Sequence, residues 1–155
     1  MLALLDWASK WWVLQFLRPT DEWVIIPGFF QIILAKNPGI AFGFFQEGES
    51  LLKVAVFSCI SLAGILFLVL WGDQIASESV FSKTSLALIL GGIIGNLGDR
   101  LYHGYVVDFL DVSWRQYHWP TFNLADSCIT VGVLMLACVE LISPRPSTPK
   151  PINTE

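Results

Sequence analysis

An uncharged run of 18 residues, residues 54–71, constrains this chain more than any other feature of its sequence. About 20 mostly apolar residues are needed to cross the hydrocarbon core of a bilayer. The composition agrees with a membrane location, because 54% of the 155 residues are hydrophobic and only 14% are charged. Soluble domains carry about 25% charged residues. The sequence therefore predicts a small integral membrane protein that forms one domain over residues 1–155.

Four apolar segments predict a mainly helical membrane fold. The expected transmembrane helices lie at residues 1–17, 53–71, 84–102 and 124–142. Residues 18–50 and residues 104–122 then fall on one side of the membrane, and both termini fall on the other. Counting Lys and Arg in these segments does not decide which side is cytoplasmic. The proline-rich residues 144–155 predict a flexible tail.

The segment at residues 18–50 is expected to form strands rather than helix. Residues 23–35 alternate around a turn at Pro27 and Gly28, as in a pair of strands. The aromatic residues favour a belt at the membrane interface over direct contact with a substrate. They are Trp23, Phe29, Phe30, Phe42, Phe44 and Phe45.

Charge and cysteine usage exclude several classes of function. Nine Lys and Arg stand against thirteen Asp and Glu, and the net charge is -4, so a nucleic-acid partner is not expected. Three cysteines without a CxxC pair and two histidines indicate neither a disulfide framework nor a zinc site. We therefore expect no metal and no cofactor.

Polar residues in the third span need a physical reason, because a charge at the bilayer centre costs about 2.5–3.5 kcal/mol on insertion scales. Asn96, Asp99 and Arg100 are spaced three or four residues apart, which places them on one face of a helix. Gly92 and Gly95 allow a neighbouring helix to approach closely. The polar face is therefore expected to point into the protein. For Asp99 the favoured interpretation is a structural ion pair with Arg100 that locks helices together. For Arg100 a structural and a functional role both stay open.

Asp108 and Asp126 are the two candidate catalytic residues. Asp108 lies in the apolar stretch YVVDF after the third span, which predicts a partly buried carboxylate near the interface. Asp126 follows Asn123, a favoured N-cap residue, by three positions, and capping alone explains both residues. The positive end of the helix favours the ionised form of Asp126. Asp111 is interpreted as a solvated loop acid rather than a further functional carboxylate.

The predicted topology brings Asp108 and Asp126 to the same face of the membrane. Two carboxylates within about 3 Å of each other share a proton, because both cannot ionise readily. One then acts as a general base toward a water molecule, and the other, protonated, polarises a carbonyl group. This is the chemistry of an aspartic peptidase, which needs neither a nucleophilic side chain nor a metal.

Several motifs together resemble one known family. Residues 91–112 (GGIIGNLGDRLYHGYVVDFLDV) and residues 122–129 (FNLADSCI) are similar to the lipoprotein signal peptidase family, also called signal peptidase II. The resemblance extends to residues 37–42 (NPGIAF) and to the D-x-x-x-K pattern of Asp6 and Lys10. Each motif alone is weak, but all of them occur in the family order.

The resemblance implies a peptidase with four transmembrane helices, a small extracytoplasmic β-cradle and an arm over the active site. The implied substrate is a prolipoprotein with a diacylglyceryl group on its lipobox cysteine, cut on the N-terminal side of that cysteine. Motif positions imply that Asp108 and Asp126 are catalytic. Residues implied to bind substrate or support the pair are Asn37, Asn96, Arg100 and Asn123. Residues expected to be structural are Asp6, Lys10, Gly92, Gly95 and Asp99.

The resemblance also implies a location and partners. The protein is expected in the bacterial inner membrane, with its active site near the periplasmic face and both termini in the cytoplasm. The lipidated precursor and membrane lipid are the expected partners, and the chain is expected to act as a monomer. Five residues precede Asp6, fewer than in typical members, so the first span is expected to be abbreviated at its start.

Two other functions stay open on the residues alone. A small proton- or ion-translocating protein also places Asp, Arg and His in its spans. Such a path predicts polar residues along all spans, whereas residues 54–71 offer only Ser58, Cys59 and Ser61. A non-catalytic membrane subunit predicts no sensitivity to a change of Asp to Asn.

Overall fold

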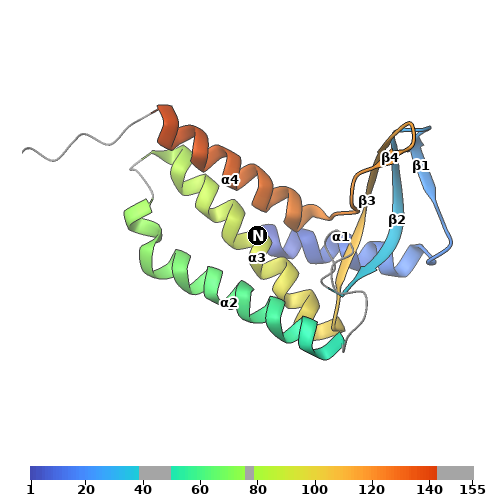
Figure 1. The fold of residues 1–155 in the computed structure, drawn as a ribbon, viewed down its shortest axis with the longest axis horizontal. Helices are drawn as coiled ribbons and strands as arrows, with labels where there is room; N and C mark the ends of the chain where they lie inside the picture. The colour runs from blue at the N-terminus through green and yellow to red at the C-terminus, as the bar shows by residue number, and fades with distance from the viewer. Residues whose placement is uncertain (39–49, 76–78, 143–155) are drawn as a thin grey trace, which may run out of the picture.

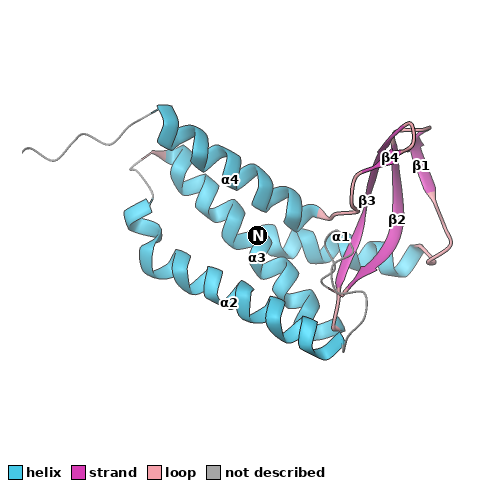
Figure 2. Ribbon diagram, in the orientation of Figure 1, coloured by secondary structure: helices cyan, strands magenta, loops and turns pink. Residues whose placement is uncertain are grey.

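The computed structural model describes residues 1–38, 50–75 and 79–142 and shows four helices with a small sheet at one end (Figure 1). The helices are α1 (Leu2–Phe16), α2 (Ser50–Ile75), α3 (Val80–His103) and α4 (Leu124–Ile142). The strands are β1 (Trp23–Ile26), β2 (Phe30–Asn37), β3 (Val106–Trp114) and β4 (Tyr117–His118). In Figure 2 the strands lie beyond the ends of α3 and α4, on the side away from the α2–α3 connection. This arrangement confirms the mainly helical fold with a small sheet.

Helices occupy all four predicted spans. Helices α2, over Leu51–Ile75, and α3, over Val80–His103, are long and apolar enough to cross a membrane. In α4 a shorter apolar stretch covers Leu124–Val139. Helix α2 continues past the predicted end of its span at residue 71 to Ile75, because polar residues such as Asp73 and Gln74 do not break a helix. Helix α3 ends at His103, and the C-cap residue Gly104 adopts a left-handed conformation with φ 76°.

Strands β1 to β4 form one antiparallel sheet in the order β1-β2-β3-β4. The predicted strand pair is present as β1 and β2, and Gly28 in their turn has a φ of 71°. Strand β3 was not predicted. Its residues Val106 to Phe109 are all buried, so the strand lacks the alternation of apolar and polar residues that marks a half-buried strand. Its pairing with β2 places Ala35 opposite Asp108.

Close contacts between helices centre on the glycines of α3. A Cβ atom at Gly92 would fall onto the carbonyl oxygen of Ala125 in α4. A Cβ atom at Gly95 would lie 2.6 Å from the Oδ2 atom of Asp6 in α1. Any larger residue at these two positions would therefore push α1 or α4 away from α3.

Some sequence-based expectations fall on residues outside the described ranges. These are the tail at residues 144–155, positions 39–42 of the NPGIAF motif, and the aromatic residues Phe44 and Phe45. Asn37, at the start of that motif, is described and ends β2.

Candidate active site

Asp108 and Asp126 come from different elements and line the same cavity. Asp108 lies on β3 and is 2% exposed, whereas Asp126 lies in the first turn of α4 and is partly exposed. The open cavity has a volume of about 480 Å³ and is also lined by Asn37 at the end of β2 and by residues 119–122. The structure thus brings together two acids that are separated in sequence by a strand, a turn and a loop.

Asn123 contacts both carboxylates. Its Nδ2 atom donates to Asp108 Oδ1 at 2.7 Å, and its backbone N–H donates to Asp126 Oδ2 at 3.2 Å. In return, its Oδ1 atom accepts from the backbone N–H of Asp126 at 2.9 Å, which completes a reciprocal cap at the start of α4. The capping arrangement is therefore present, and the same residue also holds Asp126 next to Asp108.

Two further asparagines donate to the remaining carboxylate oxygens. The Nδ2 atom of Asn37 donates to Asp108 Oδ2 at 2.9 Å, and the Nδ2 atom of Asn96 donates to Asp126 Oδ1 at 2.7 Å. Each of the four carboxylate oxygens thus accepts a hydrogen bond. Side-chain amides orient a carboxylate without adding charge, so these hydrogen bonds fix the geometry of the pair.

Burial raises the pKa of Asp108 to about 6, from an ordinary value of 3.8. Loss of water around the carboxylate is the largest cause, and the negative charge of Asp126 raises the pKa further. The hydrogen bonds from Asn37 and Asn123 oppose this increase. A fraction of the molecules therefore holds a proton on Asp108 near neutral pH. The negative charge of Asp126 contributes to this protonation.

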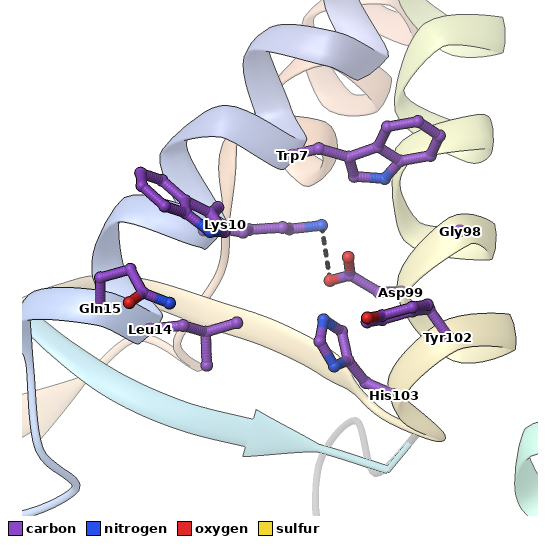
Figure 3. A pocket seen from close by; sticks show the side chains of 9 residues that line it. Trp7, Lys10, Leu14, Gln15, Gly98, Asp99, Tyr102 and His103 are labelled. Atoms are coloured by element: carbon purple, nitrogen blue, oxygen red, sulfur yellow. Dashed lines mark ion pairs between the residues drawn. The ribbon is translucent and has the colours of Figure 1, made fainter.

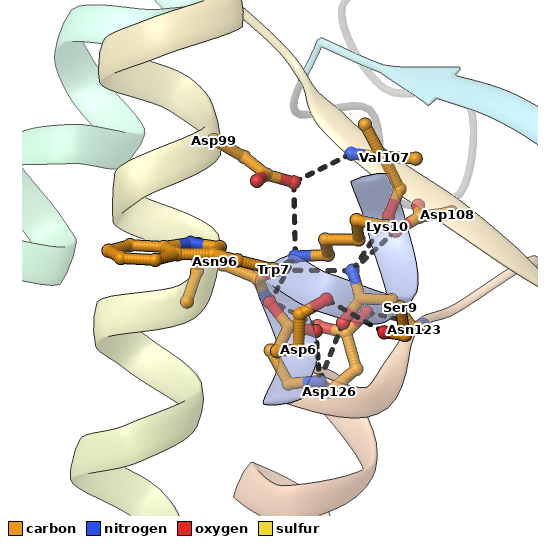
Figure 4. Close-up of polar contacts among 12 residues, drawn as sticks. Asp6, Trp7, Ser9, Lys10, Asn96, Asp99, Val107, Asp108, Asn123 and Asp126 are labelled. Carbon is orange, nitrogen blue, oxygen red and sulfur yellow. Dashed lines mark hydrogen bonds and ion pairs between the residues drawn. The ribbon is translucent and has the colours of Figure 1, made fainter. Parts of the chain in front are cut away.

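A buried ion cluster lies beside the two acids (Figure 4). We call Lys10, Asp6, Asp99 and Asn96 the Lys10 cluster. The Nζ atom of Lys10 lies 2.7 Å from Asp6 Oδ2 and 3.0 Å from Asp99 Oδ2, and it donates to Asn96 Oδ1 at 2.9 Å. Asp99 thus pairs with Lys10 of α1, and the expected ion pair with Arg100 is not found among the described residues. Residues next to each other on a helix do not face each other, which disfavours a pair of Asp99 with Arg100.

A second cavity, of about 530 Å³, is lined by residues of α1 and α3. The ion pair of Lys10 with Asp99 forms part of its wall (Figure 3). Its lining includes Trp7, Leu14 and His103. Neither Asp108 nor Asp126 is among its lining residues. This cavity is therefore separate from the one that holds the two acids.

Arg100 lies near the two acids without a hydrogen bond to either among the described residues. Its Nη1 atom donates to the carbonyl oxygen of Asn96 at 3.2 Å, and its guanidinium group lies 5.6 Å from the centre of the Phe57 ring. Its positive charge interacts with the negative charges of Asp108 and Asp126. The structure thus gives Arg100 an electrostatic influence on the pair.

Asp111 is buried, and the prediction of a solvated loop acid is wrong. It is 6% exposed and accepts a hydrogen bond from Gln31 Nε2 at 2.7 Å across the sheet. The error follows from the missed strand, because β3 pairs Asp111 with Gln31 of β2. Residues three apart on a strand point to opposite faces, so Asp111 is directed away from Asp108.

Comparisons with known proteins agree on one family. Residues 1–142 match the family described as signal peptidase (SPase) II. The lipoprotein signal peptidase of Syntrophotalea carbinolica is 39% identical over 136 residues, which cover 88% of this chain and 83% of that protein. The lipoprotein signal peptidase of Cellvibrio japonicus is 37% identical over 154 residues, which cover 99% of this chain and 89% of that protein.

A solved bacterial membrane enzyme has the same fold. That structure, determined by the in meso method at 2.3 Å resolution, superposes with a TM-score of 0.81 at 29% sequence identity. The match covers 96% of this chain and 88% of the other. The confirmed resemblance therefore extends from short motifs to the whole fold. This chain belongs to the signal peptidase II family, whose members are aspartic peptidases.

Proposed function

We propose that this chain is a membrane aspartyl endopeptidase that removes the signal peptide from diacylglyceryl-modified prolipoproteins. The cut falls on the N-terminal side of the lipidated cysteine. The observation that carries the proposal is the pair of acids, Asp108 and Asp126, held by one asparagine at the edge of one cavity. The names of the relatives support the class of substrate.

In this reaction Asp126 is the base and Asp108 is the acid. The carboxylate of Asp126 takes a proton from a water molecule, whose oxygen attacks the carbonyl carbon before the cysteine. The proton on Asp108 passes to the carbonyl oxygen. When the C–N bond breaks, Asp126 returns its proton to the leaving amine, and the hydroxyl of the intermediate returns a proton to Asp108. The raised pKa of Asp108 and the position of Asp126 at a helix N-terminus support this assignment.

Four polar residues support the reaction in this proposal. Asn37, Asn96 and Asn123 orient the carboxylates through the hydrogen bonds that they donate. Arg100 stabilises the negative charge of the pair or binds a polar part of the substrate.

The proposal includes a topology. All four helices span the inner membrane, both termini face the cytoplasm, and the sheet and the two acids lie at the periplasmic face. The position of the sheet at one end of the helices supports this arrangement (Figure 1). Exposed Trp23, Trp114 and Trp119 in and beside the sheet are typical of a membrane interface. The single domain acts as a monomer in contact with membrane lipid and without nucleic acid.

Cleavage of a lipidated precursor by the purified chain in liposomes tests the proposed function. We expect a gel shift that corresponds to loss of the signal peptide, and no shift with the unmodified precursor. Addition of a metal chelator is expected to leave the initial rate unchanged, because two carboxylates and water suffice for the chemistry. Cleavage that ceases with the chelator, or that proceeds equally without the lipid group, would contradict the proposal.

Cleavage is expected to slow as the pH rises above about 6, because Asp108 then loses the proton that it donates. The fall in kcat/KM approaches about tenfold per pH unit when one proton is required. Stability is also expected to fall as the pH rises. The folded chain binds this proton more tightly than the unfolded chain, so the free energy of unfolding falls as the pH rises from 3.8 through about 6.

A pH–rate profile measures this effect, and Asp111→Asn is the matched control. Asp111 is a buried acid on the same strand, but its carboxylate contacts Gln31 and His118 and lines neither cavity described above. The control should therefore keep the wild-type profile. A wild-type rate that is flat between about pH 5 and 8 would disprove the assignment of the acid.

A further inference from the structure

The Lys10 cluster holds the backbone immediately before one of the two acids. Asp6 Oδ1 accepts a hydrogen bond from the backbone N–H of Ala125 at 2.9 Å, and Ala125 directly precedes Asp126. The other oxygen of Asp6 is held by Lys10 at 2.7 Å. A contact from α1 therefore fixes the first turn of α4 (Figure 4).

The same cluster holds the backbone before the other acid. Asp99 Oδ2 accepts a hydrogen bond from the backbone N–H of Val107 at 3.0 Å, and Val107 directly precedes Asp108. The same oxygen lies 3.0 Å from the Nζ atom of Lys10. Lys10 is 2% exposed, and its ammonium group makes ion pairs with Asp6 and Asp99 and a hydrogen bond to Asn96.

Lys10 also determines which way the amide of Asn96 faces. The Oδ1 atom of Asn96 accepts from Lys10 Nζ at 2.9 Å and from Asn123 Nδ2 at 3.1 Å. Because two donors hold the oxygen, the amide nitrogen is turned toward Asp126 Oδ1, to which it donates at 2.7 Å. The flipped amide would place its NH₂ group against two donors and its oxygen against a carboxylate.

We propose that Lys10 is a positioning residue for the peptidase reaction, which acts through Asn96 on the catalytic carboxylate of Asp126. This inference rests on the proposed function. Lys10 does not line the cavity of the two acids, so it is not itself a catalytic residue. Its ammonium group keeps the Asn96 amide in the one orientation that donates to Asp126. A purely structural ion pair would stabilise the helices without any coupling to the reaction through Asn96.

The variant that tests this role must not leave two buried acids without a cation. Lys10→Met alone would leave Asp6 and Asp99 buried without a cation, because both face Lys10. The double variant Lys10→Met/Asp99→Asn keeps the net charge of the cluster at the wild-type value, and the asparagine still offers an oxygen to the backbone N–H of Val107. Asp99→Asn alone is the matched control, since it leaves the contact between Lys10 and Asn96 intact.

A double-mutant cycle with Asn96→Ala measures the coupling. We expect Lys10→Met/Asp99→Asn to lower kcat about tenfold relative to Asp99→Asn, which corresponds to about 1.4 kcal/mol on the barrier. KM for the lipidated precursor should stay close to that of the control, whereas the melting temperature should fall, because the buried Asp6 loses its cation. When Asn96→Ala is added to both chains, the difference in kcat should disappear, because Lys10 has lost the group through which it acts.

Two results would overturn the inference while leaving the proposed function in place. One is wild-type cleavage together with equal kcat values for Lys10→Met/Asp99→Asn and Asp99→Asn. The other is a tenfold loss that persists unchanged beside Asn96→Ala, as expected of a merely structural ion pair. A wild-type chain that does not cleave the lipidated precursor would instead overturn the proposed function, and the positioning role with it.

Discussion

Replacement of Asp108 or Asp126 by asparagine is expected to lower the rate of precursor cleavage by about 10²–10⁴-fold. Asparagine has nearly the shape of aspartate, but its amide can neither take a proton from water nor donate one to a carbonyl oxygen. The introduced asparagine keeps one oxygen acceptor, but its NH₂ group replaces an oxygen that accepts a hydrogen bond in the wild type, so each variant is expected to be less stable than the wild type. Initial rates on a lipidated precursor in liposomes, with melting temperatures in detergent, measure the two effects separately.

Asp111→Asn is the control for this loss, because Asp111 is a buried acid on the same strand as Asp108. It should cleave at the wild-type rate. Full cleavage by either Asp108→Asn or Asp126→Asn would disprove the catalytic pair. A variant of Asp108 or Asp126 that is slow because it has unfolded is recognised by its melting temperature.

Gly92→Ala is expected to reduce the free energy of unfolding by about 1–3 kcal/mol, the usual range for overpacking a tight contact. The added methyl group would fall onto the carbonyl oxygen of Ala125, which is a backbone atom and cannot rotate away. It would also lie 2.6 Å from Ile129 Cγ1. Because Ala125 directly precedes Asp126, displacement of this turn should also slow cleavage.

Gly64→Ala, on α2, is the matched control for Gly92→Ala. A methyl group at Gly64 would lie 3.5 Å from Ile93 Cδ1, an ordinary van der Waals distance. Alanine also has the higher helix propensity, so this control should be as stable as the wild type or more stable. Thermal unfolding in the same detergent compares the two variants. Equal melting temperatures would show that α3 and α4 are not in tight contact at Gly92.

The parts of the molecule that depend on neighbouring residues were predictable from the sequence. Apolar runs indicated the four helices, although residues 1–17 are short for a span, because a helix in lipid satisfies its own backbone hydrogen bonds. The cap of α4 was predictable from Asn123 and Asp126, since the two residues interact within one turn. The turn at Gly28 was likewise visible as a local signal.

The contacts that join distant segments were not predictable in the same way. Strand β3 pairs with β2 across a gap that contains two whole helices, and its buried residues carry no alternation. The environment of Asp111 was therefore assigned wrongly. The partner of Asp99 was missed for the same reason, because Lys10 lies on the first helix of the chain. Family motifs pointed to the site residues, but only the structure shows which of them touch.

The contact between Asp6 and Ala125 joins residues 119 positions apart, on the first and the last helix of the described chain. A protein made on the ribosome emerges with its N-terminus first. Lys10 and Asp6 therefore leave the ribosome well before the helix that carries Asp126 has been synthesised. If Asp126 is catalytic as proposed, the nascent polypeptide has no hydrolytic capacity until its fourth helix has been made, so the order of biosynthesis itself delays proteolysis until assembly is complete.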